Sequence, residues 1–310
     1  MSGPYSDIVE AIGHTPLVEL QSFSPKPGVR IFAKLEGHNP TGSVKDRIAR
    51  AMIEQAELSG QLKPGGTILE PTSGNTGISL AMIAGRKGYK VRVVMPENVS
   101  EERTRLLTIF GAEIVYSPAS QGTNGSIVMA RRLAGEDPSL FMPYQYGNAA
   151  NPLAHYETTG PEIVAALPEV DVFVAGLGTG GTLMGAGRRL REHNPQVKII
   201  AAEPYQGQLV DGLRSLDDGF IPPVLNLDEL DGKIMVTTAD SFAASLRLTR
   251  QEGIFAGVSC GAVVHAALRC SQRLDRGNIV CLLADAGWKY LSSELWTKGY
   301  DENAEKKFWW

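Results

Sequence analysis

A lysine follows a short run of small residues near the start of the chain. Residues 39–47 read NPTGSVKDR, which places Lys45 behind a Pro-Thr-Gly turn signal. Burial in a cleft destabilises a lysine ammonium, so the pKa falls and the amine can form a Schiff base with an aldehyde. A lone lysine is more simply interpreted as a solvated surface side chain. Lys45 is therefore a candidate reactive amine whose assignment depends on its neighbours.

Two further segments follow predicted strands and open predicted helices. The segment EPTSGNTG covers residues 70–77, and GLGTGGTLMG covers residues 176–185. The backbone N–H groups at such a helix start can bind a carboxylate or a phosphate. The first segment is equally compatible with a well-capped loop. The second favours a ligand because glycines allow close approach and threonines add hydroxyls, at Gly178, Thr179, Gly180, Gly181 and Thr182.

The second glycine loop predicts a site for one phosphate group. It matches the weak G-x-G-x-x-G pattern of dinucleotide sites, but Glu203 precedes a proline and no better acid follows. The loop also lacks the G-K-[ST] ending of a nucleotide P-loop. A nicotinamide dehydrogenase would rest on this loop alone. A reactive lysine together with a monophosphate site instead indicates the aldehyde cofactor pyridoxal 5′-phosphate.

A third segment, GIFAGVSCGA, places Ser259 and Cys260 between glycines at a predicted helix start. A nucleophilic cysteine needs a base, and His265 is close in sequence without any thiol-protease pattern around it. A packed thiol is the favoured interpretation of Cys260. The three cysteines lack C-x-x-C spacing, so neither a disulfide nor a metal site is predicted.

The elements around these segments predict an α/β fold with two lobes. Predicted strands and helices alternate from about Arg30 to Asp285, and most strands are nearly continuous apolar runs, as in parallel sheets buried on both faces. Each lobe is expected to be a twisted, mostly parallel sheet flanked by helices. We predict a smaller mobile domain at 43–155, a larger domain at 1–42 and 156–310 that holds the phosphate, and an aromatic tail at 301–310.

The composition excludes several classes of partner. The 310 residues are 43% hydrophobic and 21% charged, with a net charge of −4 and no basic run. Nothing indicates nucleic acid or a membrane surface, and no segment approaches the ~18 apolar residues of a membrane span. The N-terminus lacks the basic and apolar regions of a secretion signal, and with the unpatterned cysteines this predicts the cytoplasm.

The sequence resembles the cysteine synthase family of pyridoxal-phosphate enzymes, a group that includes the tryptophan synthase β-subunit. The resemblance extends from Ile12 to Ala262 and rests on IGHTPLVEL, KLEGHNPTGSVKDR, EPTSGNTGISLAM, GLGTGGTLMG and EGIFAGVSCGA. Within the family, the sequence is most similar to B-type isozymes of the actinobacterial kind that uses O-phosphoserine. The resemblance implies the fold type II architecture of these enzymes and a homodimer.

The resemblance also implies roles for individual residues. Lys45 matches the Schiff-base lysine, Asn75 the residue that binds the cofactor's 3′-oxygen, and Ser259 the residue that faces its pyridine nitrogen. Residues 178–182 match the phosphate-binding loop. Cys260 stands where the family usually has serine or threonine, with little expected consequence. The substrate's α-carboxylate is expected to contact Thr72, Ser73, Gly74, Thr76 and Gln145.

The implied reaction is a β-replacement that makes L-cysteine from O-phospho-L-serine or O-acetyl-L-serine through an α-aminoacrylate intermediate. The implied sulfur donor is sulfide or a small carrier protein that ends in a thiocarboxylate. Arg214, in YQGQLVDGLRSLDDGF, matches the arginine that binds the substrate phosphate, for which its planar, permanently charged fork is suited. The alternative for Arg214 is a surface ion pair with Asp217 or Asp218.

Three alternatives remain open from the sequence. The same scaffold supports a serine or threonine ammonia-lyase, or a cystathionine β-synthase-type reaction. The chain is also compatible with a module that binds serine acetyltransferase without turnover.

The final KKFWW is costly to expose to water, so it is expected to dock at the active-site mouth or on a sister subunit.

Overall fold

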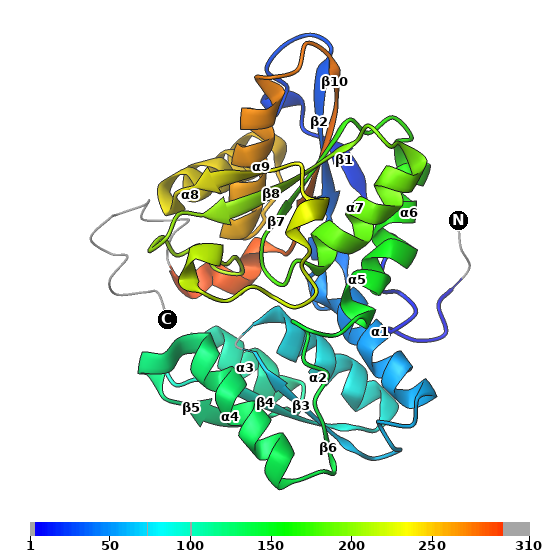
Figure 1. Cartoon of the computed structure of the whole chain (residues 1–310), viewed down its shortest axis with the longest axis vertical. Coiled ribbons are helices and arrows are strands. Elements are labelled where there is room, and N and C mark those ends of the chain that lie inside the picture. Colours follow the sequence, from blue (N-terminus) through cyan, green and yellow to red (C-terminus); the bar gives the residue numbers. More distant parts are fainter. Residues whose placement is uncertain (1–3, 73, 100, 294–310) are drawn as a thin grey trace.

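The computed structural model describes residues 4–72, 74–99 and 101–293, and it contains two mainly parallel sheets with helices on both faces. The two sheets lie one above the other along the long axis of the molecule (Figure 1). The predicted α/β class is therefore confirmed. The predictions for Ser73 and for the tail at 301–310 fall outside the described residues.

The larger sheet has six strands in the order β1-β2-β10-β7-β8-β9, and only β1 is antiparallel to its neighbour. Along β7, Val172 and Val174 join the core on one face, whereas Phe173 and Ala175 join the core on the other. This burial on both faces explains the continuous apolar runs of the sequence. The strands are β1 (Leu17–Glu19), β2 (Val29–Leu35), β7 (Val172–Gly176), β8 (Lys198–Pro204), β9 (Gly232–Val236) and β10 (Gly277–Leu283).

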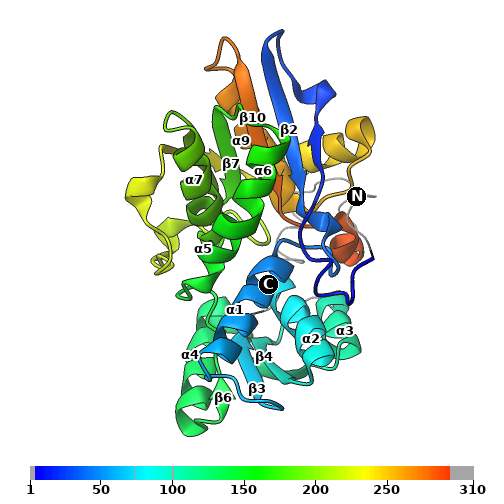
Figure 2. The same ribbon diagram turned by 90° about the vertical axis from the view of Figure 1, so that its right-hand side faces the viewer.

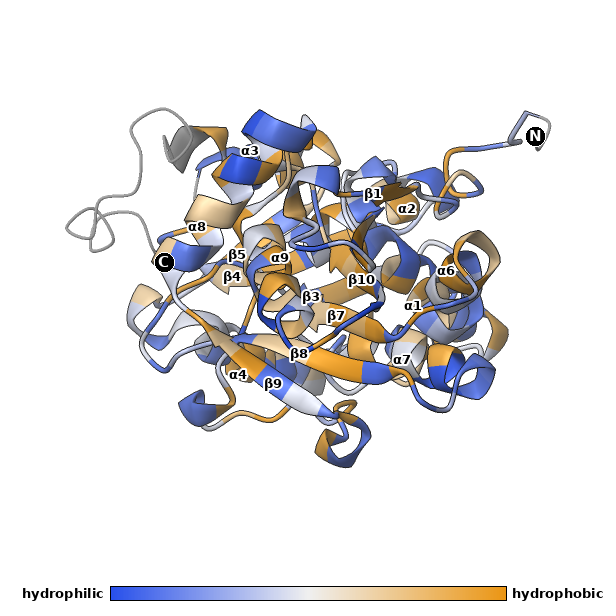
Figure 3. Cartoon of the chain, turned by 90° about the horizontal axis from the view of Figure 1, so that it is seen from above, coloured by the Kyte–Doolittle hydropathy of each residue, from blue (hydrophilic) through white to orange (hydrophobic). Residues whose placement is uncertain are grey.

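Helices cover both faces of the larger sheet (Figure 2). The pair α6 (Gly160–Ala166) and α7 (Gly181–His193) packs on one face. The pair α8 (Thr238–Arg247) and α9 (Val258–Ser271) lies on the other. Seen from above, the central strands β7 and β10 of this sheet carry apolar colour (Figure 3).

The smaller sheet has four parallel strands in the order β5-β4-β3-β6. Its strands are β3 (Thr67–Pro71), β4 (Lys90–Pro96), β5 (Glu113–Ser117) and β6 (Leu140–Phe141). One face packs against α1 (Lys45–Leu58), α2 (Asn75–Lys87) and α3 (Glu101–Ile109), and the other packs against α4 (Gly122–Glu136).

A buried charge network joins α1 to the elements of the larger sheet. The Arg47 guanidinium lies 2.7 Å from both Glu36 and Glu162, and Lys34 lies 2.6 Å from Glu162. Buried ion pairs are favourable only when the remaining hydrogen-bonding groups of both partners are satisfied. Here the Thr15 hydroxyl donates a hydrogen bond to the Glu36 carboxylate. The short segment α5 (Ala150–Ala154) also contacts both α1 and α7. The predicted domain boundaries stay a prediction.

Short helical turns complete the described chain: η1 (Gln21–Phe23), η2 (Glu36–His38), η3 (Ala119–Gln121), the π-helix η4 (His155–Thr159), η5 (Leu216–Asp218), η6 (Leu227–Glu229), the π-helix η7 (Leu248–Glu252) and η8 (Gly287–Ser293). Among the described residues, no helix is both long and apolar enough to cross a membrane.

Candidate active site

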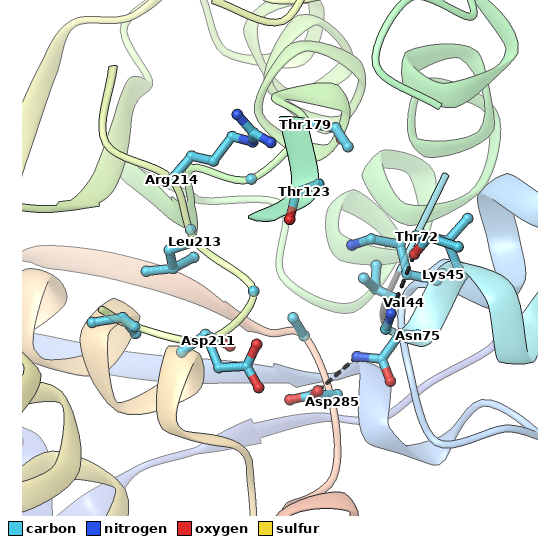
Figure 4. Close-up of a pocket in the computed structure, with 18 of the residues that line it drawn as sticks. Val44, Lys45, Thr72, Asn75, Thr123, Thr179, Asp211, Leu213, Arg214 and Asp285 are labelled. Carbon is cyan, nitrogen blue, oxygen red and sulfur yellow. Dashed lines mark hydrogen bonds between the residues drawn. The ribbon is translucent and has the colours of Figure 1, made fainter. Parts of the chain in front are cut away.

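A cavity of about 580 Å³ lies where the carboxyl ends of strands from both sheets meet. Ligands of open parallel sheets bind at this edge, and ligand sites commonly measure ~300–1,000 Å³. The loops after β3, β7, β8 and β10 all contribute lining residues. The site residues predicted from the sequence line this cavity wherever the structure describes them, with the exception of Gly181. Figure 4 shows some of the residues that line the cavity.

The small residues before Lys45 attach it to the end of β10. The Val44 N–H donates to the Ala284 carbonyl at 2.8 Å, and Ser43 forms an isolated bridge with Asp285. Lys45 is the first residue of α1, so its side chain leaves this junction into the cavity (Figure 4). Burial lowers the pKa of Lys45, although the nearby charges of Asp285 and Glu36 oppose the change. The lowered pKa favours a neutral, nucleophilic amine.

Asn75 begins α2 and reaches across to the other sheet. Its Nδ2 donates to Asp285 Oδ2 at 2.7 Å, and its Oδ1 accepts from Lys289 Nζ at 2.6 Å. The Asp285 carboxylate also accepts a hydrogen bond from the Tyr290 hydroxyl. Asn75 is thus held on both sides of its amide by residues that follow β10.

The predicted carboxylate-binding residues gather at the carboxyl end of β3. Thr76 donates its hydroxyl to Gln145 Oε1 at 2.7 Å. Buried Glu70 accepts from the backbone N–H of Gln145 at 3.1 Å and of Tyr144 at 2.8 Å, so it anchors that loop. Burial raises the pKa of Glu70 to about 7, against the effect of these two hydrogen bonds. Lining residues of this group are Thr72, Gly74, Thr76 and Gln145.

The glycine-threonine loop joins β7 to α7. Gly180 has φ +86°, a left-handed conformation that glycine adopts without strain, and it turns the chain into α7, whose second residue, Thr182, lines the cavity. Asn151 Nδ2 donates to Thr179 Oγ1 at 3.0 Å, and His155 Nε2 lies 3.2 Å from Thr182 Oγ1. Burial lowers the pKa of His155 to about 3, so its ring is neutral. The loop can therefore present hydroxyls and backbone donors to a phosphate.

Ser259 and Cys260 have different environments at the start of α9. Ser259 lines the cavity, whereas the side chain of Cys260 is buried with Sγ 3.5 Å from the Asp285 carbonyl oxygen. Burial and the Asp285 charge raise the pKa of Cys260, which keeps the thiol protonated. All three cysteines are free thiols. No cluster of potential metal ligands occurs in the part of the chain that the structure describes.

Arg214 lies in the loop after β8 and packs against two aromatic rings that contact each other edge to face. Its guanidinium carbon is 4.6 Å from the ring centre of Phe220 and 5.0 Å from that of Tyr146. No carboxylate of the described chain lies within ion-pair distance of Arg214, so the ion pairs considered with Asp217 and Asp218 are not formed. Its charge is therefore available to a ligand in the cavity.

Several residues at the site were not singled out from the sequence. Tyr146 frames Arg214, His155 contacts the phosphate loop, and Asp285 and Lys289 hold Asn75. Asp285 carries one usable signal, because a polar residue just after a buried parallel strand lies at the binding edge of a sheet. The contacts of the others depend on chain segments that are distant in sequence.

Comparisons with known proteins agree with this geometry. Residues 8–285 match the family model described as "Pyridoxal-phosphate dependent enzyme". A probable cysteine synthase of Bacillus subtilis is 43% identical over 304 residues, which cover 94% of this chain and 98% of that protein. A cysteine synthase of Staphylococcus aureus is also 43% identical, with 95% and 98% covered.

Solved structures of related enzymes are also similar to this chain over nearly its whole length. An O-ureido-L-serine synthase is 37% identical with a TM-score of 0.91, and the match covers 97% of this chain and 99% of that one. The cysteine synthase of Entamoeba histolytica is 36% identical with a TM-score of 0.90, covering 97% and 94%.

Proposed function

This chain belongs to the pyridoxal-phosphate dependent enzymes, as a member of the cysteine synthase family, and on that basis we propose that it makes L-cysteine from O-phospho-L-serine with Lys45 as its catalytic amine. The cofactor is pyridoxal 5′-phosphate. The observation that supports the phosphorylated donor is Arg214, which lines the cavity without an acidic partner among the described residues.

The residues of the cavity fit the cofactor. Lys45 supplies an amine of lowered pKa for its aldehyde, and residues 178–182 supply hydroxyls and the start of α7 for its phosphate. We assign Asn75 to its 3′-oxygen and Ser259 to its pyridine nitrogen, in line with the family resemblance. When bound, the cofactor withdraws electrons from the substrate α-carbon.

The remaining residues would bind and orient the substrate. We assign the loop of Thr72, Gly74 and Thr76, with Gln145, to its α-carboxylate, because these residues present donors at the start of α2. The lowered pKa of Lys45 suits it to take the proton from the substrate α-carbon as a general base. Ser73, in the same loop, keeps its predicted role as a proposal only.

Arg214 would hold the leaving phosphate. Contact with the rings of Tyr146 and Phe220 restricts the guanidinium without consuming its positive charge. Next to it, Ser215 is among the residues that line the cavity, and its buried hydroxyl has no hydrogen-bond partner among the described residues. A planar cation at the cavity suits a phosphate dianion better than a neutral acetyl group.

The wider setting follows the family resemblance. We propose sulfide or a thiocarboxylated carrier protein as the sulfur donor, a homodimer as the assembly and the cytoplasm as the compartment. The ammonia-lyase alternative predicts pyruvate in the absence of sulfide, so one assay distinguishes it from cysteine synthesis.

The test compares two donors across matched variants, with L-cysteine formation from sulfide as the measurement. Arg214→Ala is expected to lower kcat/KM for O-phospho-L-serine about 10- to 100-fold, as for a lost charged hydrogen bond of ~1.5–3 kcal/mol, with O-acetyl-L-serine affected less than about threefold. Lys45→Ala is expected to abolish turnover of both donors, and Arg250→Ala, at an exposed arginine, to change neither. Equal losses on both donors in Arg214→Ala would refute the phosphate role.

A further inference from the structure

Two charged side chains after β10 lie buried at the cavity without a role in the reaction described above. Asp285 is 2% exposed and Lys289 is 4% exposed, and both line the cavity. Charged groups are rarely buried to this extent unless a specific partner compensates their lost hydration. The partner that they share is Asn75.

The two side chains hold Asn75 from opposite sides of its amide. Asp285 Oδ2 accepts from Asn75 Nδ2 at 2.7 Å, a bond drawn in Figure 4. Lys289 Nζ donates to Asn75 Oδ1 at 2.6 Å. Asn75 begins α2 on the smaller sheet, whereas its two partners follow the last strand of the larger sheet. The three residues therefore link the two sheets beside Lys45.

This arrangement permits only one orientation of the amide. Rotation of the amide by 180° would bring Asn75 Oδ1 against the Asp285 carboxylate and Nδ2 against the Lys289 amine, exchanging two hydrogen bonds for two repulsions. An amide nitrogen carries two N–H groups, and Asp285 uses one of them. The second N–H of Asn75 is left to donate to a ligand in the cavity.

We propose that Asp285 and Lys289 are positioning residues that lock the Asn75 amide with its remaining N–H directed to an oxygen of the bound cofactor. The inference rests on the role proposed above for Asn75. It assigns Lys289 to hydrogen bonding and leaves the reactive amine to Lys45 alone.

The charges around Lys289 support its role as a donor. Burial lowers the pKa of Lys289 to about 8, with Asp285 and Asp46 raising it, and Lys45 and Arg103 lowering it. At neutral pH the Lys289 amine is therefore mostly protonated. A protonated amine donates hydrogen bonds and does not attack an aldehyde.

The test measures cofactor binding to the cofactor-free protein by absorbance titration, without substrate. Lys289→Met is expected to raise the Kd for pyridoxal 5′-phosphate about tenfold and to alter the visible absorbance of the bound cofactor. Asn75→Ala is expected to give a similar change. The double variant should be no worse than Asn75→Ala alone, because one residue acts through the other. Lys289→Arg should restore the Kd to within about threefold of wild type, and Lys63→Met, at an exposed lysine, should match wild type.

Three results would overturn the proposal: an unchanged Kd and spectrum in Lys289→Met, effects of Lys289→Met and Asn75→Ala that multiply, or a cofactor adduct on Lys289 after borohydride reduction and peptide mapping. Where Lys289→Met fails to fold, Asp285→Asn is measured instead, with the same expected increase in Kd and the same lack of addition to Asn75→Ala. Because the titration contains no donor substrate, the measured Kd values for pyridoxal 5′-phosphate are independent of the proposed donor preference. Conversely, loss of the donor preference would leave the binding result intact.

Discussion

At the scale of single residues, burial sets the protonation states around the cavity. It lowers the pKa of Lys45 and of His155, because each charged form is cationic, and it raises the pKa of Glu70, because its charged form is anionic. Burial therefore favours the neutral form of basic and of acidic side chains alike. At mildly acidic pH the imidazole of His155 is therefore neutral and the carboxyl group of Glu70 is protonated, and the amine of Lys45 loses its proton more readily than that of an ordinary lysine.

Glu70 makes a pH-dependent contribution to stability. With a pKa of about 7 in the folded state against an ordinary 4.5, folded Glu70 keeps a proton between about pH 4.5 and 7 that the unfolded chain releases. The free energy of unfolding contributed by Glu70 therefore decreases as pH rises through that range, by up to ~3 kcal/mol. His155 acts in the opposite sense, since its lowered pKa makes the unfolded chain bind the extra proton.

Glu70→Gln isolates this contribution because His155 is common to both proteins. We expect the difference in unfolding free energy between variant and wild type to become more favourable to the variant from pH 5 to pH 7. Urea denaturation at the two pH values measures it, with Glu157→Gln, at an exposed carboxylate, as the control. A difference that is constant with pH would show that Glu70 is not protonated in the folded state.

At the scale of elements, close helix packing places the phosphate loop. A Cβ added at Gly185 of α7 would lie 1.9 Å from the Pro152 carbonyl oxygen, and one at Gly181 would lie 1.8 Å from Asn151 Oδ1. The start of α7 therefore packs directly against α5, with no room for a side chain between them. This contact holds the helix start, and with it residues 178–180, at the cavity.

Gly185→Ala is expected to push α7 away from α5, with a loss of about 3 kcal/mol in unfolding free energy and weaker cofactor binding. Gly85→Ala in α2 is the matched control, because nothing lies within 4 Å of its added Cβ. There the change should stabilise the helix by ~0.5–1 kcal/mol. Denaturation curves and cofactor titrations of both variants check this, and equal effects would contradict close packing as the cause.

At the scale of the whole molecule, contacts across the cavity connect the two sheets. Arg103 on α3 forms an ion pair with Asp211 in the loop after β8, and its guanidinium lies 5.7 Å from the Tyr290 ring centre. The side chains of this pair are 15% and 27% exposed. The pair therefore restrains separation of the two cavity walls with a modest, partly screened attraction.

Arg103→Gln is expected to speed dissociation of the bound cofactor about two- to fivefold, corresponding to ~0.5–1 kcal/mol for a partly exposed pair. Asp211→Asn should have the same effect, and the double variant should add little to either. Stopped-flow absorbance with an excess of competing scavenger measures the rate. Wild-type rates in both single variants would show that the pair does not restrain the cavity.

The sequence by itself determined the α/β class, the cofactor and the family, because these depend on local patterns. Apolar runs mark buried strands, and the segments around Lys45, residues 70–77 and residues 176–185 carry the motifs at strand ends. The roles of single residues, the domain boundaries, the B-type resemblance and the donor preference stay predictions.

Only the tertiary structure decided which side chains meet. Asn75 pairs with Asp285 and Lys289 across 210 and 214 positions of sequence, and Glu70 anchors Gln145 across 75. Arg214 packs against Tyr146 and Phe220 instead of pairing with the neighbouring acids. No local pattern encodes such contacts, because they form only when the strand ends of two separate sheets are brought to one cavity.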